Sequence, residues 1–158
     1  MDLKMSAKIK KEEGASAIEF AIILPLLLIL LFGIIEFSIL LYDKAMLTNA
    51  SREGARVGIV YRYQDGGPNH PGDTEIATTV GQYVQNHLIS FASGSVVNTT
   101  IDRIDRDGNG DYDSPGDSLT VTVDYQYNFL VFDSLLSLIG PPFSNGITLD
   151  AVTVMRME

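Results

Sequence analysis

The sequence predicts an α+β protein in which a long N-terminal helix precedes a second helix and a small antiparallel sheet. Three observations support this prediction. The segment from Phe20 to Tyr42 is apolar over 23 residues and contains one acidic or basic side chain, Glu36. Residues 118–128 alternate between apolar and polar side chains, as a half-buried strand does. Residues 74–90 carry apolar side chains at helical spacing.

Charge is distributed unevenly along the 158 residues, whose net charge is −9. Four lysines precede the apolar segment, whereas residues 57–158 contain four arginines and thirteen acids. Phosphate recognition needs basic patches, so the acidic distal part argues against nucleic acid as a partner. The chain has no cysteine, which excludes disulfides, thiol catalysis and cysteine-ligated metals.

The apolar segment is long enough to cross a membrane. At ~1.5 Å per residue it forms a helix ~34 Å long, against a hydrocarbon core of roughly 30 Å. The lysines before it predict a cytoplasmic N-terminus and a translocated C-terminal part. The small residues of 14–17 come before the apolar run, so cleavage after the run by a signal peptidase is not expected. The predicted organisation is a leader (1–14), a membrane helix (15–42), a helical stem (43–62) and an outer α+β domain (63–158).

The stem continues the helical pattern to about Tyr61. Ala50, Gly54 and Gly58 place small side chains at four-residue spacing on one face. Because glycine costs roughly 1 kcal/mol in a helix interior, this ladder predicts that another backbone comes close. Two alternatives fit: the protein's own sheet or an adjacent subunit.

The outer domain begins with a loop and a second helix. Residues 64–73 contain Gly-Gly-Pro and Pro-Gly and are predicted to be a loop. Asp73 is predicted to N-cap the helix at about 74–90. His87 lies on the apolar stripe of that helix and is expected to pack at the edge of the core rather than to bind a metal.

Three strands follow, at 96–104, 118–128 and 147–157. Residues 132–143, FDSLLSLIGPPF, separate the last two. They are expected to form a short helix or an apolar loop, which either caps the core or presents a patch to a neighbour.

An acidic segment, residues 105–117, joins the first two strands. Its Asp-x-Asp-x-Asn-Gly-Asp pattern matches the first seven positions of an EF-hand-type calcium loop, in which side-chain oxygens converge on the cation and a glycine permits the sharp turn. The predicted calcium ligands are Asp105, Asp107, Asn109, Asp111, Asp113 and Asp117. The expected closing acid at position twelve is replaced by Gly116, and Asp117 follows one residue later. The alternative is a solvated acidic hairpin loop, because turns favour these residue types.

No candidate catalytic residue emerges from the sequence. A nucleophile paired with a base, a phosphate-binding loop and a cofactor fingerprint are all absent from the sequence. The protein is therefore not expected to be an enzyme.

The residues that follow the lysines resemble a type IV prepilin processing site. Gly14-Ala15-Ser16-Ala17-Ile18-Glu19-Phe20 begins the match, and Leu24-Pro25, Phe32–Phe37 and Leu47–Arg56 extend it over residues 14–56. The whole pattern resembles the TadE-like pseudopilins of tight-adherence (Flp-type) pilus systems. This resemblance implies a type IV pilin-like fold and cleavage by a prepilin peptidase between Gly14 and Ala15.

The resemblance also assigns assembly roles to the membrane helix. Glu19 would pair with the free N-terminal amine of a neighbouring subunit and so set the register, with Phe20 beside it. A carboxylate at the membrane edge is costly, which agrees with a need for a partner. Pro25 removes one helical hydrogen bond and either permits a useful curvature for bundle packing or is simply tolerated.

The expected function is thus a structural or assembly subunit, a minor pilin or pseudopilin, of a bacterial tight-adherence pilus. Its expected partners are a prepilin peptidase, other pilin or pseudopilin subunits, the pilus assembly machinery and the lipid bilayer. It is expected to cross the inner (cytoplasmic) membrane once, with the C-terminal domain outside, and to enter a surface pilus from there. The alternative is a permanently membrane-anchored, calcium-dependent binding or adhesion module that never enters a filament.

Overall fold

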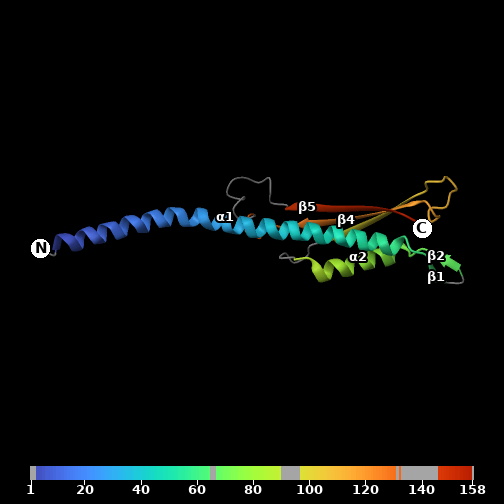
Figure 1. Cartoon of the computed structure of the whole chain (residues 1–158), viewed down its shortest axis with the longest axis horizontal. Helices are drawn as coiled ribbons and strands as arrows, with labels where there is room; N and C mark the ends of the chain where they lie inside the picture. The colour runs from blue at the N-terminus through green and yellow to red at the C-terminus, as the bar shows by residue number, and fades with distance from the viewer. Residues whose placement is uncertain (1–2, 65–66, 90–96, 131, 133–145, 158) are drawn as a thin grey trace. The chain divides into compact units, whose positions relative to one another are not determined.

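The computed structural model describes all residues except 1–2, 65–66, 90–96, 131, 133–145 and 158. Its elements are α1 (Leu3–Gly58), β1 (Arg62–Gln64), β2 (Gly67–Asn69), α2 (Asp73–His87), β3 (Val97–Ile104), β4 (Ser118–Tyr127) and β5 (Ile147–Arg156). A long apolar helix, a second helix and a three-stranded antiparallel sheet confirm the predicted α+β class (Figure 1).

The chain divides into two compact units, Met1–Phe37 and Ser38–Glu158. In the first unit, the described residues belong to α1 alone. Its large apolar side chains from Ile18 to Phe37 are exposed except for Leu24, and Ile22 keeps 72% of its surface accessible. One helix in the described part of the chain is long and apolar enough to cross a membrane, which fits a single-pass anchor.

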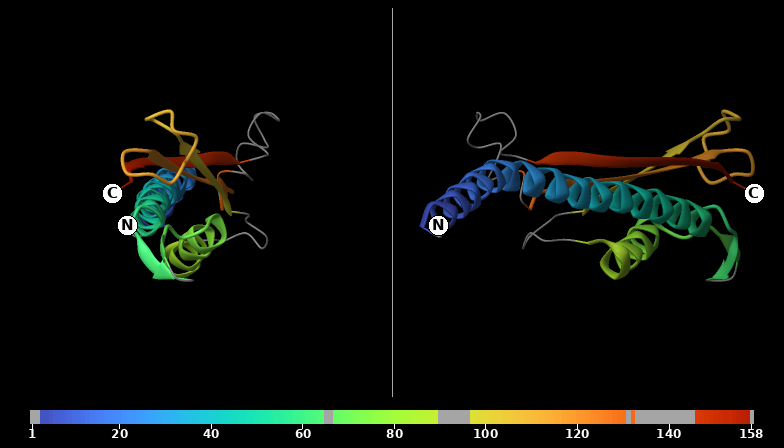
Figure 2. Two further views of the ribbon diagram at one scale, coloured as in Figure 1. Left: turned by 90° about the vertical axis from the view of Figure 1, so that its right-hand side faces the viewer. Right: turned by 60° about the vertical axis from the view of Figure 1, so that its left-hand side comes forward.

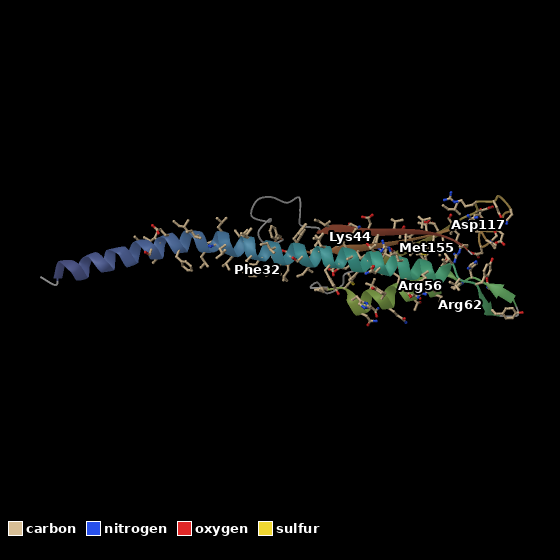
Figure 3. The ribbon with its side chains drawn as sticks, in the orientation of Figure 1. Phe32, Lys44, Arg56, Arg62, Asp117 and Met155 are labelled. Atoms are coloured by element: carbon tan, nitrogen blue, oxygen red, sulfur yellow. The ribbon has the colours of Figure 1, made fainter. Side chains whose placement is uncertain are left out.

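The second unit packs two helices against one face of the sheet. The strand order is β3-β4-β5, so β4 is central. The C-terminal half of α1 and the whole of α2 lie on the same side of this sheet (Figure 2). Helix α1 is held to β5 by a 2.7 Å contact between the hydroxyls of Ser51 and Thr153 and by a hydrogen bond from Lys44 Nζ to the Asp150 carbonyl, and Figure 3 labels Lys44 beside β5.

Strand β4 follows the predicted alternation from Leu119 to Tyr127. Its inward side chains are all at most 2% exposed: Leu119, Val121, Val123, Tyr125 and Tyr127. The predicted strands 96–104 and 147–157 correspond to β3 and β5, which pair antiparallel with β4 on either side. The core of the second unit therefore forms between β4 and the two helices.

The small-residue ladder of α1 packs against the protein's own chain. A Cβ built on Gly54 would lie 2.5 Å from Val80 Cγ2, and one built on Gly58 would lie 2.4 Å from Leu119 Cδ2. Ala50 is also fully buried. Of the two alternatives for this ladder, the protein's own sheet is confirmed through Leu119 and Val121 of β4, and α2 is an additional neighbour that the prediction did not include. Helix α1 ends at Gly58, slightly before Tyr61.

Helix α2 corrects the predicted role of Asp73. The N-cap is Gly72, and no side chain caps this helix end. Asp73 is the first helical residue, and its carboxylate forms an ion pair with Arg103 of β3 instead. A carboxylate in the first turn still interacts favourably with the helix dipole. The apolar stripe buries Ile76, Val80 and Val84.

His87 is exposed instead of lying at the core edge. Its ring stacks on Tyr83 with centroids 4.3 Å apart, and its Nδ1 lies 2.8 Å from the Tyr83 carbonyl oxygen. It is the last residue of α2, beyond the buried residues Ile76, Val80 and Val84. The expectation that it does not belong to a histidine metal site stays a prediction.

The segment predicted to be a loop contains a short hairpin. Strands β1 and β2 pair antiparallel, with Gln64 opposite Gly67, so two residues connect them. Those two residues are Asp-Gly, a dipeptide that favours tight hairpin turns. After β2, His70 is 6% exposed and its ring lies 4.0 Å from that of Tyr61. The prediction for residues 132–143 concerns a segment of which the structure describes only Phe132.

Asp43 is a buried carboxylate of α1 that contacts the segment after α2. Its Oδ1 accepts a hydrogen bond from the Ile89 backbone N–H at 3.0 Å, while Oδ2 has no hydrogen-bond partner among the described residues. Burial raises the pKa of this carboxyl above its usual value, and the bond from Ile89 only partly opposes the increase. Folding therefore favours the protonated form of Asp43.

This raised pKa gives a pH-dependent prediction. The stabilisation from protonated Asp43 is fully present below the unfolded pKa of 3.8 and is lost as pH rises through the higher folded pKa. Asp43→Asn keeps an acceptor for Ile89 and has no charge, so we expect it to be about 1 kcal/mol more stable than wild type at neutral pH. The difference between the two should shrink toward pH 4 in denaturant unfolding.

Asp43→Ala is the control, because it removes the acceptor and should be less stable than Asp43→Asn at every pH. A wild-type protein that is more stable than Asp43→Asn at neutral pH would contradict the interpretation of Asp43 as an uncompensated buried charge.

Candidate functional site

The acidic loop, residues 105–117, connects β3 to β4 at one end of the sheet, where Figure 3 labels Asp117. Three glycines give it left-handed backbone positions: Gly108 (φ 76°), Gly110 (φ 84°) and Gly116 (φ 111°). Non-glycine residues rarely adopt such angles, so the glycines permit the repeated tight turns. The connection is therefore an ordered arrangement of turns built on side-chain-to-backbone hydrogen bonds.

Asp105 organises the first half of the acidic loop. Its Oδ1 accepts a hydrogen bond from Gly108 N at 2.6 Å, and its Oδ2 accepts one from Gly110 N at 2.9 Å. These two bonds, first that from Gly110 and then that from Gly108, lower the pKa of Asp105 below its usual value. Asp105 is thus held ionised.

The next three side chains form consecutive Asx turns. Asp107 Oδ1 accepts from Asn109 N at 3.0 Å, Asn109 Oδ1 from Asp111 N at 2.6 Å, and Asp111 Oδ1 from Asp113 N at 3.1 Å. Each bond links a side chain to the backbone two residues later, as short polar side chains do in turns. Three successive turns of this kind therefore shape residues 107–113.

Asp117 closes the acidic loop. Its side chain is fully buried; Oδ1 accepts from Arg106 N at 2.8 Å, and Oδ2 accepts from Ser114 N and Oγ at 3.0 and 2.8 Å. The bond from Arg106 N is the main cause that lowers its pKa. Its backbone oxygen also accepts from Met157 N at 2.8 Å, which ties the loop to the end of β5.

Three carboxylates converge at this point. Asp105, Asp107 and Asp117 each offer an oxygen, and these oxygens lie within 4.8 Å of one another. Calcium–oxygen distances are 2.3–2.6 Å, so two ligands of one ion are at most about 5 Å apart. The donor set and spacing fit a hard divalent cation. Like charges this close repel, and a cation would offset the repulsion.

Asp113 takes a different position among the predicted ligands. Its Oδ1 lies 2.8 Å from Arg103 Nε in an ion pair, and its backbone oxygen accepts from Tyr61 Oη at 3.1 Å. Arg103 also donates to the Pro71 carbonyl at 3.1 Å and pairs with Asp73. The acidic loop is thereby connected to the start of α2, mainly through Arg103.

Sequence reasoning missed Arg103 and Ser114, which position the loop. Ser114 Oγ lies 2.8 Å from Asp117 Oδ2 and 3.0 Å from Asn109 Nδ2. A serine before a proline in a turn-rich segment gives no distinctive signal. Arg103 is a basic residue at an inward position of β3, and a side chain of this kind calls for acidic partners.

The predicted processing and assembly residues all lie in α1. The helix contains Gly14 and Ala15 without interruption. Glu19 and Phe20 are exposed, and Phe20 keeps 61% of its surface accessible. Pro25 lies inside the helix. Here the chain presents a continuous apolar surface that carries one carboxylate between residues 15 and 35.

Comparison with known proteins gives one match. No curated protein and no solved structure matches the chain. The family model of TadE-like proteins matches residues 14–56, which span the exposed apolar part of α1 and its packed C-terminal part. The family resemblance of the sequence is therefore confirmed over this segment: residues 14–56 are similar to TadE-like proteins.

Proposed function

We propose that this protein is a minor pilin or pseudopilin of a bacterial tight-adherence pilus, anchored in the inner membrane through residues 15–42 and processed by a prepilin peptidase after Gly14. The observation that carries the proposal is the match of residues 14–56 to TadE-like proteins. The exposed apolar surface of α1 supports it, because such a surface needs either lipid or the helices of other subunits around it.

In this proposal the N-terminal helix has two successive roles, as a membrane anchor and as a packing element between subunits. It first holds the subunit in the bilayer, with the lysine-rich leader on the cytoplasmic side. After cleavage it packs against the helices of other subunits, and Glu19 pairs with the new amino group of a neighbour. A carboxylate among apolar side chains favours a cationic partner, since an unpaired charge is costly in a low-dielectric environment.

Intact mass of the membrane-extracted protein tests the processing step. In cells with an active prepilin peptidase, we expect a chain that begins at Ala15. Gly14→Val should block cleavage and leave the full-length mass, because a bulky residue replaces the glycine at the cleaved bond. Ala7→Val, a bulky substitution elsewhere in the leader, is the matched control and should be processed normally.

A wild-type mass that starts at Met1 in such cells would contradict the processing step and favour the alternative, a permanently anchored binding module. Cell-surface fractionation separates the two further. A cleaved pilus component should appear in sheared surface material together with other pilus subunits, whereas an anchored module should remain with the membrane.

We also propose that the acidic loop binds calcium through Asp105, Asp107 and Asp117, which would stiffen the outer domain. The mutual distance of their oxygens, within 4.8 Å, supports this assignment. Asn109 and Asp111 are further candidate ligands, through oxygens that each also accept one backbone hydrogen bond. Asp113 would contribute indirectly, since its carboxylate pairs with Arg103.

A further inference from the structure

The acidic loop contains two dipeptides that can react spontaneously with their own backbone, Asp107-Gly108 and Asn109-Gly110. In an Asn-Gly sequence, the glycine nitrogen attacks the side-chain amide carbon, closes a five-membered succinimide and expels ammonia. Water then opens the ring to aspartate or isoaspartate. In an Asp-Gly sequence the same attack expels water, and ring opening returns aspartate or isoaspartate. Glycine favours both reactions because no side chain hinders its nitrogen.

One carboxylate holds both attacking nitrogens. Gly108 N donates to Asp105 Oδ1 at 2.6 Å, and Gly110 N donates to Asp105 Oδ2 at 2.9 Å. Each nitrogen must lose its proton and turn toward the preceding side chain to react. A hydrogen bond to an ionised carboxylate opposes both changes, since charge-assisted bonds are among the stronger ones in proteins.

The attacked side chain of Asn109 is also held in place. Its Oδ1 accepts from Asp111 N at 2.6 Å, and its Nδ2 donates to Asp107 Oδ2 at 2.9 Å and to Ser114 Oγ at 3.0 Å. Rotation of the amide toward Gly110 N would break these bonds. Asn109 is nevertheless solvent-exposed, so water for ring opening has access.

We propose that Asn109-Gly110 is a site of spontaneous deamidation and Asp107-Gly108 a second site of succinimide formation, and that the hydrogen bonds of Asp105 slow both reactions in the folded loop. Reaction at Asn109 would either add a carboxylate or insert an extra backbone atom before Gly110. The second product would break the Asx turn between Asn109 and Asp111. The proposal requires no bound metal and does not depend on the function proposed above.

The test compares Asp105→Ala with Asp111→Ala in the full chain in detergent. Both variants remove one charge from the same loop, but only the first frees the two glycine nitrogens. During incubation in a mildly alkaline, EDTA-containing buffer, mass spectrometry of proteolytic peptides follows deamidation at Asn109, and isoaspartate-specific methyl transfer follows Asp107. We expect Asp105→Ala to react about tenfold faster than wild type and Asp111→Ala to react at close to the wild-type rate.

The chain carries its own reference, since Asn145-Gly146 has the same reactive sequence outside this loop. Its rate should be the same in all three proteins. Asp105→Asn is the second variant in case alanine disturbs the fold, because it keeps the side-chain shape and one strong acceptor; at least one of the two dipeptides should then react faster. Equal rates at both dipeptides in wild type, Asp105→Ala and Asp105→Asn would overturn the proposal.

Discussion

Gly54→Leu is expected to destabilise the second unit by at least about 3 kcal/mol, a large fraction of the stability of a small domain. At this position α1 touches α2 and β4 together. An added Cβ would lie 2.5 Å from Val80 Cγ2, 3.4 Å from Ile76 Cγ2 and 3.5 Å from Val121 Cγ1. Val80 is fully buried and β-branched, so it has little rotamer freedom to move aside. Leucine would therefore force the helix away from the sheet.

Near-ultraviolet circular dichroism of the full chain in detergent can measure this loss. All seven tyrosines follow residue 37 and so belong to the second unit, and the chain has no tryptophan. The tyrosine signal consequently reports the unit formed by α2, the sheet and the C-terminal half of α1. Its denaturant midpoint should fall sharply in Gly54→Leu, while the far-ultraviolet helical signal of the first unit remains.

Gly81→Ala is the matched control, because the Cβ at Gly81 meets nothing within 4 Å. Alanine is the better helix former, so this variant should gain about 0.5–1 kcal/mol. The two glycines of the same protein should thus respond in opposite directions. A Gly54→Leu protein with the wild-type midpoint would mean that α1 does not pack against α2 and β4 as described.

The elements that the sequence predicted best are those in which one physical signal dominates. The apolar composition of residues 20–42 predicted a helix long enough to cross a membrane, and α1 includes such a helix. The strict alternation of β4 determines both its secondary structure and its buried face. The small-residue ladder predicted that another segment packs closely against α1. Which segment does so followed only from the structure, in which Val80 and Leu119 contact it.

The error at Asp73 arises because a long-range partner decides a local structure, whereas the missed hairpin has a signal in the local sequence. Asp73 has the side chain of an N-cap, yet Arg103, thirty residues later, draws its carboxylate into an ion pair. The hairpin of β1 and β2 was overlooked because Gly-Gly-Pro suggested a loop without strands, although Asp65-Gly66 is a hairpin signal. The local propensity of Asp73 contains no information about a residue that only the folded chain brings next to it.

The acidic loop shows both situations together. The spacing of Asp105, Asp107 and Asn109 predicted a turn with inward oxygens, and the three residues do form successive turns. In the EF-hand pattern the closing acid is expected at position twelve, where this sequence has Gly116, so the pattern did not predict which acid closes the loop. Because Gly116 adopts φ 111°, the chain turns once more and brings Asp117 next to Asp105 and Asp107.

Calcium is expected to raise the unfolding temperature of the second unit on the order of 10 °C when its concentration exceeds the dissociation constant about a hundredfold. The physical reason is linkage, since a cation that binds only the folded loop stabilises the folded state. Binding also relieves the repulsion among Asp105, Asp107 and Asp117, whose oxygens lie within 4.8 Å of one another. The tyrosine signal in millimolar calcium and in EDTA provides the measurement.

Asp107→Asn should abolish most of this calcium shift. Asp107 is exposed, and asparagine retains an acceptor for the Asn109 backbone, so the loop should still form without calcium. Asp117→Asn should abolish the shift as well. It should also lower the unfolding temperature without calcium, because the buried asparagine has one acceptor oxygen fewer for the backbone N–H groups of Arg106 and Ser114. Asp124→Asn removes a charge from β4 outside the loop and should keep the full shift.

The pattern across these variants separates a specific site from general screening of an acidic domain. Screening depends on net charge, so it would reduce the calcium shift equally in Asp107→Asn and Asp124→Asn and would reproduce it with other salts at matched ionic strength. Coordination requires oxygens at defined positions, so magnesium, which demands shorter octahedral bonds, should give a smaller shift than calcium. An unfolding temperature that is the same in calcium and EDTA for the wild-type protein would leave the acidic loop as a solvated hairpin held by its own hydrogen bonds.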